Sequence, residues 1–200
     1  MQRVCVGPGA IGAAVKRQLL ALGAYTFVSA GERAAVDVAV CTVGRLRIGV
    51  PLTTGAAENM MVSNFLIPRA FVEWSIAAMQ HDQRPGHILV LGSNAALFGA
   101  SEAADYAAGK AALKKYCELR ARAVKADGIR ISLLNFGGVA TESFWTKATA
   151  GVDPADYANV VPGARTPLTV DEAAAVVVAA ITLPPNIVFR DCLITSVDYQ

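Results

Sequence analysis

The sequence predicts an α/β fold in which helices cover both faces of a single, doubly wound parallel sheet. Short apolar runs typical of strands alternate along the chain with longer amphipathic or Ala-rich runs typical of helices. No internal repeat and no linker interrupts this alternation, so residues 1–200 are expected to form one domain. With 54% hydrophobic and 17% charged residues, the chain can bury a substantial core.

The chain begins with a strand, a glycine-rich turn and a helix. Residues 3–6 are an apolar strand, residues 7–12 read G-x-G-x-x-G, and residues 13–22 form an amphipathic helix that stops at Gly23. Glycines in this position allow a pyrophosphate to approach the backbone at a helix N-terminus, although a glycine turn can also be purely structural. The context favours a Rossmann-type nucleotide site that includes Gly7, Gly9, Ile11 and Gly12.

The second strand, residues 25–29, should end beside the ribose of a bound dinucleotide. An acidic residue there suits NAD, whereas a basic residue suits the 2′-phosphate of NADP. The sequence places Glu32 and Arg33 together, so both signs are present. Arg33 with Ser29 would hold a phosphate, and a solvated Glu-Arg turn is the alternative. NADP is the expected cofactor, with NAD as the alternative.

A third apolar run, residues 36–41, follows after too few residues for a full helical crossover between parallel strands. The next helix is expected over residues 54–79 and contains Asn64 within an otherwise apolar pattern. Asn64 is either a surface or back-bonded residue or a buried group with a function.

The central stretch of the chain carries the residues with the clearest chemistry. Tyr106 and Lys110 are four residues apart in an Ala-rich helical run, so they share one face. An ammonium beside a phenol lowers the phenol pKa, which would make Tyr106 a proton donor and acceptor. Ser93 follows the apolar run 87–91, at the strand end where open α/β sheets bind ligands. By itself the Tyr-Lys pair can also be a solvated helix face.

The last third of the chain returns to the same pattern. A strand over residues 129–134 runs into a glycine pair at residues 137 and 138, which allows close backbone approach to a ligand. Residues 142–167 are expected to be irregular, as a lid, a binding loop or a surface excursion. A helix over residues 171–183 and a strand over residues 192–197 complete the chain.

These features together resemble the short-chain dehydrogenase/reductase family over nearly the whole chain. The glycine turn, the segment 37–44 (DVAVCTVG), Asn64, Ser93, the Tyr106-x-x-x-Lys110 pair and the segment 130–141 occur in the family's order. The resemblance implies an oxidoreductase that interconverts a carbonyl and an alcohol with NAD(P). Tyr106 would transfer the proton, Lys110 would lower its pKa and hold the nicotinamide ribose, Ser93 would bond the substrate oxygen, and Asn64 would hold a water.

The resemblance also implies which residues contact the ligands. For the cofactor it adds Val43, Gly44, Gly137, Val139 and Thr141 to the residues above. For the substrate, a small carbonyl or alcohol compound, it indicates Ser93, Phe98, Phe144, Trp145 and Tyr157. The last four are equally readable as core residues.

The sequence departs from the family pattern near the adenine end of the cofactor site. One strand and one helix are missing between Arg33 and Asp37, so the sheet is expected to be shortened there. Pro8 stands in the glycine turn, Cys41 and Thr42 replace two amides, and Phe136 replaces a proline. The competing hypothesis is a dinucleotide-binding or dimerising protein of this fold with little or no catalysis.

Composition excludes several other classes. A net charge of +2 without a basic stripe disfavours nucleic acid, and no apolar run approaches the ~20 residues of a membrane span. Four scattered cysteines and two histidines lack metal-ligand spacing, so no metal is expected. The cysteines are typical of buried thiols in a reducing, cytoplasmic setting. Apolar helices around Asn64 and Tyr106 suggest, by resemblance, a homodimer or homotetramer.

Overall fold

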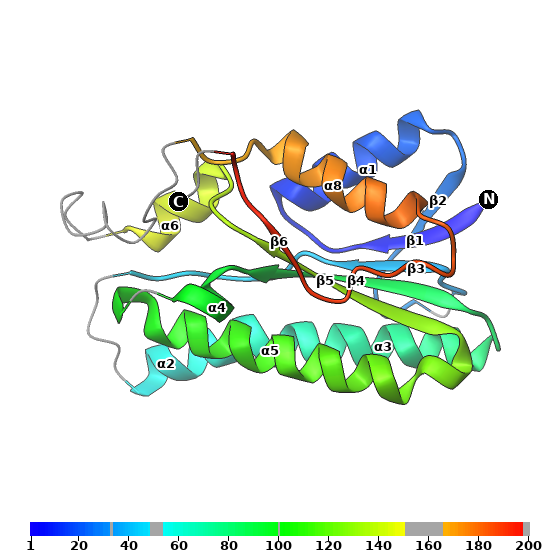
Figure 1. Ribbon diagram of the computed structural model, residues 1–200, viewed down its shortest axis with the longest axis horizontal. Coiled ribbons are helices and arrows are strands. Elements are labelled where there is room, and N and C mark those ends of the chain that lie inside the picture. Colours follow the sequence, from blue (N-terminus) through cyan, green and yellow to red (C-terminus); the bar gives the residue numbers. More distant parts are fainter. Residues whose placement is uncertain (33, 49–53, 100, 151–165, 198–200) are drawn as a thin grey trace.

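A six-stranded parallel sheet forms the centre of the chain (Figure 1). The computed structural model describes residues 1–32, 34–48, 54–99, 101–150 and 166–197. The strand order is β2-β1-β3-β4-β5-β6, and each neighbouring pair is parallel. The predicted doubly wound fold is confirmed. The strands are β1 (Gln2–Val6), β2 (Tyr25–Val28), β3 (Val38–Cys41), β4 (Gly86–Ser93), β5 (Ile129–Phe136) and β6 (Cys192–Ile194).

Helices cover both faces of this sheet, and short helices lie at the carboxyl ends of the strands (Figure 1). Among the described helices, none is long and apolar enough to cross a membrane. One face carries α1 (Ala10–Ala21) and α8 (Val170–Thr182), and the other carries α2 (Thr54–Met61), α3 (Ile67–His81) and α5 (Ala104–Ala123). The short helices are α4 (Ala95–Phe98) and α6 (Glu142–Ala148).

The core is built on the central strands, which are buried on both faces. In β4, Leu89 and Leu91 pack toward α1 and α8, whereas Ile88 and Val90 pack toward α3 and α5. A strand covered on both sides needs an unbroken apolar run rather than an alternating one, and this is what the sequence supplies. The rigid sheet therefore fixes the positions at which its strands end.

The structure corrects three boundaries that bear on function. The predicted helix 54–79 is interrupted by a π-helical turn, η1 (Val62–Leu66), which contains Asn64. Residues 142–148, predicted to be irregular, form α6. The first helix also begins at Ala10, earlier than the predicted residue 13, so Ile11 and Gly12 lie in its first turn.

The shortened edge of the sheet is confirmed. Strand β2 lies at the end of the sheet, and both β2 and β3 pair with β1. The connection between them, residues 29–37, contains no helix in its described part. It turns at Gly31, whose φ of +87° is readily available only to glycine.

Asp37 anchors the end of this connection to β1 and to the segment before β4. Its carboxylate accepts the Arg3 N–H at 2.8 Å and pairs with the Arg84 guanidinium at 2.8 Å. Burial alone would raise the pKa of Asp37, but the Arg3 N–H bond and the two guanidinium groups outweigh it and lower the pKa. The charged carboxylate therefore stabilises the fold.

We expect Asp37→Asn to lower the free energy of unfolding at pH 7 by about 1–3 kcal/mol. Because the folded-state pKa is lowered, this stabilisation is present above the usual value of 3.8 and is lost as pH falls through the lowered value. Urea unfolding of both proteins at pH 7 and pH 3 measures the difference. Equal stability of the two proteins at pH 7 would contradict the assignment.

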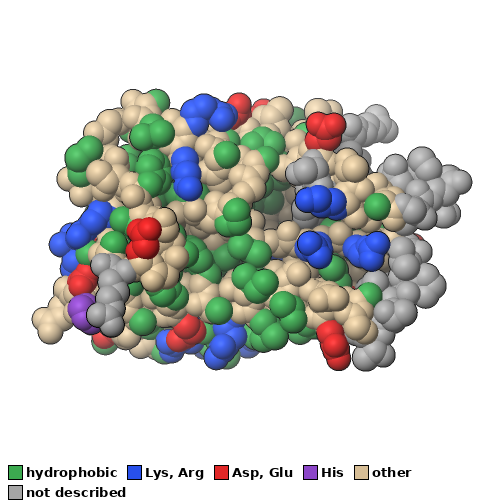
Figure 2. Space-filling model, turned by 180° about the vertical axis from the view of Figure 1, so that it is seen from behind, with side chains coloured by type: hydrophobic (Ala, Val, Ile, Leu, Met, Phe, Trp, Pro, Cys, Tyr) green, Lys and Arg blue, Asp and Glu red, His purple; other side chains and the backbone are tan. Residues whose placement is uncertain are grey.

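An exposed apolar surface lies on the face of the molecule covered by α3 and α5. Val62, Leu66 and Ile67 are exposed there, as is Leu119 on α5. Figure 2 shows apolar side chains gathered across the lower part of the face that α3 covers. A homodimer or homotetramer formed through these helices stays a prediction.

Candidate active site

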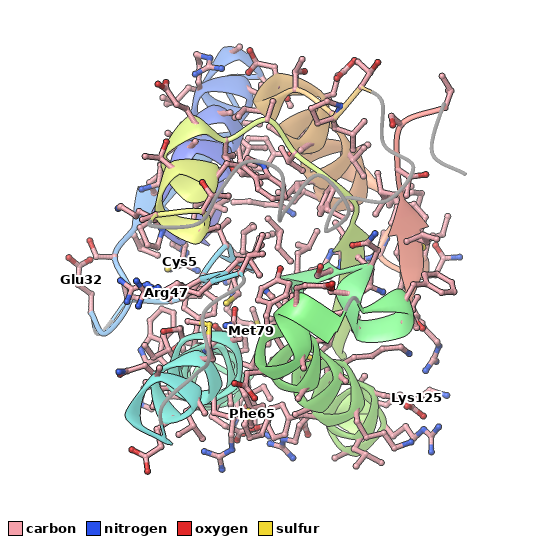
Figure 3. All side chains as sticks on the ribbon, turned by 90° about the vertical axis from the view of Figure 1, so that its left-hand side faces the viewer. Cys5, Glu32, Arg47, Phe65, Met79 and Lys125 are labelled. Carbon is pink, nitrogen blue, oxygen red and sulfur yellow. The ribbon has the colours of Figure 1, made fainter. Side chains whose placement is uncertain are left out.

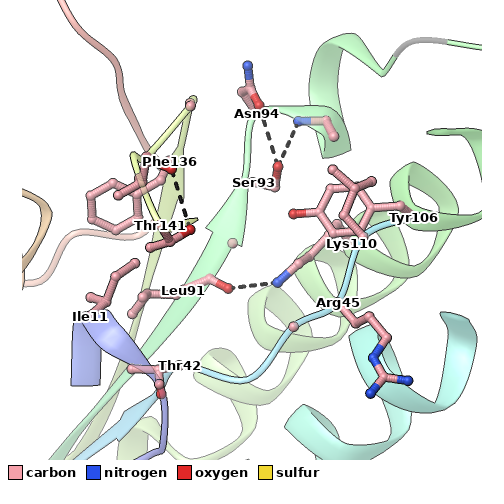
Figure 4. Close-up of a pocket in the computed structure, with 18 of the residues that line it drawn as sticks. Ile11, Thr42, Arg45, Leu91, Ser93, Asn94, Tyr106, Lys110, Phe136 and Thr141 are labelled. Atoms are coloured by element: carbon pink, nitrogen blue, oxygen red, sulfur yellow. Dashed lines mark hydrogen bonds between the residues drawn. The ribbon is translucent and has the colours of Figure 1, made fainter. Parts of the chain in front are cut away.

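A cavity of about 440 Å³ lies at the carboxyl ends of the strands, between the glycine turn and α5 (Figure 4). Open α/β sheets bind their ligands at this edge. It joins segments that are far apart in the sequence, because parallel strands bring their carboxyl ends together. The lining is formed by residues 8–11, 42–46, 91–95, 98, 99, 103, 106, 110, 136–139, 141, 145 and 147.

The glycine turn forms one end of the cavity. Each of its three glycines is needed for a different structural reason. Gly9 has a φ of +97°. A Cβ on Gly12 would lie 2.1 Å from the Gly7 carbonyl oxygen, and a Cβ on Gly7 would lie 2.6 Å from the Thr42 hydroxyl. Gly9 and Ile11 line the cavity, while Gly7 and Gly12 shape the turn from behind. The backbone is therefore packed closely enough to cradle a phosphate group.

Thr42 connects the end of β3 to this turn. Its hydroxyl donates a hydrogen bond of 2.6 Å to the Pro8 carbonyl oxygen, and Gly7 N–H donates to the Val40 carbonyl at 2.8 Å. From the sequence, Thr42 was predicted only as the replacement of an amide, and its contact with the turn was not predicted. Thr42 is 34 positions from Pro8 in the sequence, and only the pairing of β3 with β1 brings them together. Val43 and Gly44, predicted at the cofactor, line the cavity next to Thr42.

Ser93 is the last residue of β4, as predicted, and only 6% of it is exposed. Its hydroxyl oxygen accepts the Ala95 N–H at 3.2 Å, which fixes the side chain at the start of α4. In Figure 4 the Tyr106 hydroxyl points toward Ser93, whose own hydroxyl points toward Asn94 and the Ala95 N–H. A hydrogen bond with the Ser93 side chain acts on the Tyr106 phenol. Two hydroxyls thus meet at one place in the cavity.

Tyr106 extends from the first turns of α5 toward Ser93, and burial raises the pKa of its phenol. The neighbouring Ser93 hydroxyl acts in the opposite direction but does not outweigh burial. The expectation that Lys110 lowers this pKa below its ordinary value is therefore wrong for the chain alone. Desolvation disfavours the phenolate more than the nearby groups stabilise it.

Lys110 lies one helical turn further along α5 and is almost fully buried, with 4% exposed. Its Nζ lies 5.9 Å from the centre of the Tyr106 ring and donates a hydrogen bond of 3.1 Å to the Leu91 carbonyl. Burial lowers the pKa of Lys110 to about 8. Gly44 leaves the room for this ammonium, since a Cβ there would lie 3.0 Å from Nζ.

The lowered pKa of Lys110 means that its protonated form lowers the free energy of unfolding. Between pH 8 and 10.5 the unfolded state binds more protons at this site than the folded state, so the stability of the wild type rises with pH there. We expect Lys110→Met to lack this rise. The free energy of unfolding of the variant minus that of the wild type should therefore be larger at pH 7 than at pH 10, by up to about 3 kcal/mol. Thermal unfolding at the two pH values measures the change. A stability difference that does not vary with pH would contradict it.

Asn64 is fully buried in the π-helical turn. Its Oδ1 accepts the Arg45 N–H at 3.0 Å, and its Nδ2 donates to the Arg45 carbonyl at 2.7 Å and to the Met60 carbonyl at 3.0 Å. These bonds hold the backbone that follows Gly44 against η1, beside Lys110. Asn64 is thus a buried residue that positions the cavity wall; that it also holds a water remains a prediction.

The remaining predicted residues divide into three groups. Gly137, Val139 and Thr141 line the cavity, as do Phe98 and Trp145, whose Nε1 donates to the Val139 carbonyl at 2.8 Å. Ser29 does not line it. Arg33, Tyr157 and the Phe144 side chain lie outside the described residues.

Two basic side chains that were not predicted from the sequence lie at the cavity. Arg45 follows β3, and Lys147 belongs to α6, which was predicted to be irregular. Both line the cavity, and no aspartate or glutamate is among its described lining residues. Their sequence positions do not distinguish Arg45 and Lys147 from other basic residues. Only the fold brings the two to the same cavity.

The model of the short chain dehydrogenase family matches residues 49–150, which is more than half of the 200-residue chain. The chain belongs to this family. It is therefore an oxidoreductase of a family that uses NAD(P). No curated protein sequence matches it significantly.

Solved structures of short-chain dehydrogenases have the same fold. A serine dehydrogenase complexed with NADP+ matches with a TM-score of 0.82 and 16% identity, covering 98% of this chain and 95% of its own. A short-chain dehydrogenase from Streptomyces avermitilis matches with a TM-score of 0.73 and 17% identity, over 98% of this chain and 90% of its own. An alcohol dehydrogenase from Thermococcus sibiricus, complexed with 5-hydroxy-NADP, matches with a TM-score of 0.73 and 16% identity, over 100% and 98%. At these identities the likeness concerns the fold.

Proposed function

We propose that this dehydrogenase interconverts a carbonyl compound and an alcohol with NADP, or with NAD as the alternative. The observation that carries the proposal is the placing of Ser93, Tyr106 and Lys110 at one end of a cavity whose other end is the glycine turn. A nicotinamide cofactor has to be held between a phosphate cradle and a proton donor, and this cavity offers both.

The residues present fit such a cofactor. The close packing of Gly7 against Gly12 leaves the backbone of the turn open toward the cavity, at the N-terminus of α1. Gly9, Ile11, Val43, Gly44, Gly137, Val139 and Thr141 are the proposed contacts in this cavity. When bound, the nicotinamide supplies or accepts the hydride. The protein's part is orientation and proton transfer.

In the reducing direction Tyr106 is the proposed proton donor. Its raised pKa keeps the phenol protonated at neutral pH, and the phenol gives its proton to the carbonyl oxygen as the carbon receives a hydride. The Ser93 side chain, which lies next to the Tyr106 hydroxyl, would bond the same oxygen as negative charge develops.

Lys110 would stabilise the phenolate that remains on Tyr106. With a pKa of about 8, its side chain is mostly protonated at pH 7, so a positive charge lies 5.9 Å from the centre of the Tyr106 ring. Lys110 is also the proposed contact to the nicotinamide ribose. Asn64 supports this arrangement by holding the backbone beside Gly44.

Phe98 and Trp145 are proposed to contact the substrate at the mouth of the cavity. Phe98 is 64% exposed, although large aromatic side chains usually bury most of their surface. Both line the same cavity as Ser93. An apolar or aromatic carbonyl compound is the substrate class that fits these side chains.

A binding protein of the same fold is the second candidate, and the shortened edge beside β2 favours it. A chain that binds a dinucleotide without turning over a substrate would need the glycine turn but not the buried Lys110. The retention of Ser93, Tyr106 and Lys110 around one cavity favours the enzyme.

Titration with NADPH and NADH, followed by a screen of carbonyl compounds, tests the proposal. We expect binding of a reduced cofactor and its oxidation in the presence of at least one carbonyl compound. Binding without turnover across aromatic and aliphatic ketones and aldehydes would favour the second candidate. Absence of binding at millimolar concentration would reject both.

A further inference from the structure

We infer that the cavity binds the nicotinamide mononucleotide half of the cofactor and leaves the adenosine half on an open edge of the sheet. The inference rests on the proposed function and concerns which part of the cofactor supplies the affinity. The expected consequence is that reduced nicotinamide mononucleotide binds nearly as well as a reduced dinucleotide.

The extent of the cavity is the first observation. It runs from the glycine turn, past Thr42 and Lys110, to Ser93 and the segment 136–141. No described residue of β2 or of the connection 29–37 lines it. In dinucleotide-binding folds the adenosine ribose lies at the end of the second strand. The enclosed part of this site therefore ends where the first phosphate would be held.

The edge position of β2 is the second observation. In its described part the connection to β3 has no helix, so none of its described residues adds a helix over the end of β2. Residues 29–32, which follow β2, are all exposed. The match to the family model begins at residue 49, so the end of β2 lies outside the matched residues. An adenine ring placed here would lie on one surface rather than between two and would bury little apolar area.

The third observation is the hydrogen bonding of residues 29–32, the turn that follows β2. The Ser29 N–H donates to the Glu32 carboxylate at 3.1 Å, and Glu32 N–H donates to the Ser29 carbonyl at 3.3 Å. The backbone donor at the end of β2 is thus already used. Figure 3 shows Glu32 projecting outward from the sheet edge.

The nicotinamide end of the site has buried and closely packed groups that the adenosine end lacks. The glycine cradle, the buried Lys110 and the Ser93–Tyr106 pair all lie along the enclosed part. We expect an adenosine that makes few enclosed contacts to raise the affinity by no more than about tenfold, which corresponds to about 1.4 kcal/mol. The hydride comes from the nicotinamide, so the reaction itself does not require the adenosine.

Isothermal titration calorimetry tests this with four ligands: reduced nicotinamide mononucleotide, NADH, NADPH and adenosine 2′,5′-bisphosphate. We expect the first three to bind with dissociation constants within about tenfold of one another, and the bisphosphate not to displace them at millimolar concentration. A dinucleotide that binds more than tenfold tighter than the mononucleotide, or displacement by the bisphosphate, would overturn the inference and leave the proposed function standing. If none of the three nicotinamide ligands binds, both the inference and the proposed function are rejected.

Glu32→Gln is the matched variant, because it removes the charge at the end of β2 without changing the size of the side chain. We expect the ratio of the NADH and mononucleotide dissociation constants to be the same in the variant and the wild type. A selective loss of NADH affinity would instead show that Glu32 holds the adenosine ribose, and it would overturn the inference.

Discussion

Replacing Tyr106 with Phe is expected to lower kcat/KM for carbonyl reduction by a factor of about 10²–10⁴. The substitution removes only the hydroxyl that faces Ser93 and leaves the ring between α5 and the cavity. Dinucleotide affinity and thermal stability should change little, because the phenol is not part of the glycine turn. Steady-state kinetics with a substrate found by the carbonyl screen measure the loss.

Tyr116→Phe is the control for this experiment. Tyr116 lies on the same helix, but its hydroxyl bonds Glu73 on α3 and it does not line the cavity. We expect turnover in Tyr116→Phe to equal that of the wild type. Undiminished turnover in Tyr106→Phe would reject the proposed proton transfer.

Replacing Gly12 with Ala is expected to weaken cofactor binding by about 30- to 100-fold, equivalent to roughly 2–3 kcal/mol. The new Cβ would lie 2.1 Å from the Gly7 carbonyl oxygen, so the turn has to move. Moving it withdraws the backbone groups that would bind the phosphate, and the reduced mononucleotide should lose affinity together with the dinucleotides. Calorimetric titration of the variant measures both.

Gly55→Ala is the matched control, because Gly55 lies in α2 and an added Cβ there meets nothing within 4 Å. It should keep the wild-type affinity and gain slightly in helix stability. Thermal unfolding of both variants separates a loss of binding from a loss of fold. A folded Gly12→Ala protein with unchanged affinity would show that the turn does not hold the cofactor.

The architecture was predictable because each strand and helix of a parallel α/β sheet has a recognisable local sequence pattern. Residues 86–93 and 129–136 are largely buried on both faces and are rich in apolar side chains, although His87, Ser132 and Asn135 are buried polar exceptions. The glycine turn marks the first crossover. The missing unit between Arg33 and Asp37 was predictable from length alone. The helix over residues 142–148 was missed, because a seven-residue stretch followed by glycines and prolines has little helical signal of its own.

The candidate site was predictable in its residues but not in its electrostatics. Spacing brought Ser93, Tyr106 and Lys110 together, whereas the direction of the Tyr106 pKa depends on burial that only the packed structure determines. The bonds of Asn64 to Arg45 join residues nineteen positions apart and depend on the π-helical turn. Contacts of this kind have no signature in a single sequence.

Transfer of deuterium tests the central claim most directly. The wild type would be given NADPH, or NADH, that carries deuterium at the nicotinamide C4 position, with a ketone or aldehyde in ordinary water, and the alcohol would be examined by mass spectrometry. The proposed mechanism predicts one deuterium on the carbinol carbon when the label occupies the transferred C4 position, and almost no labelled alcohol over the same period with Tyr106→Phe. Alcohol formed without deuterium from either hydride position, or formed equally fast by Tyr106→Phe, would contradict it.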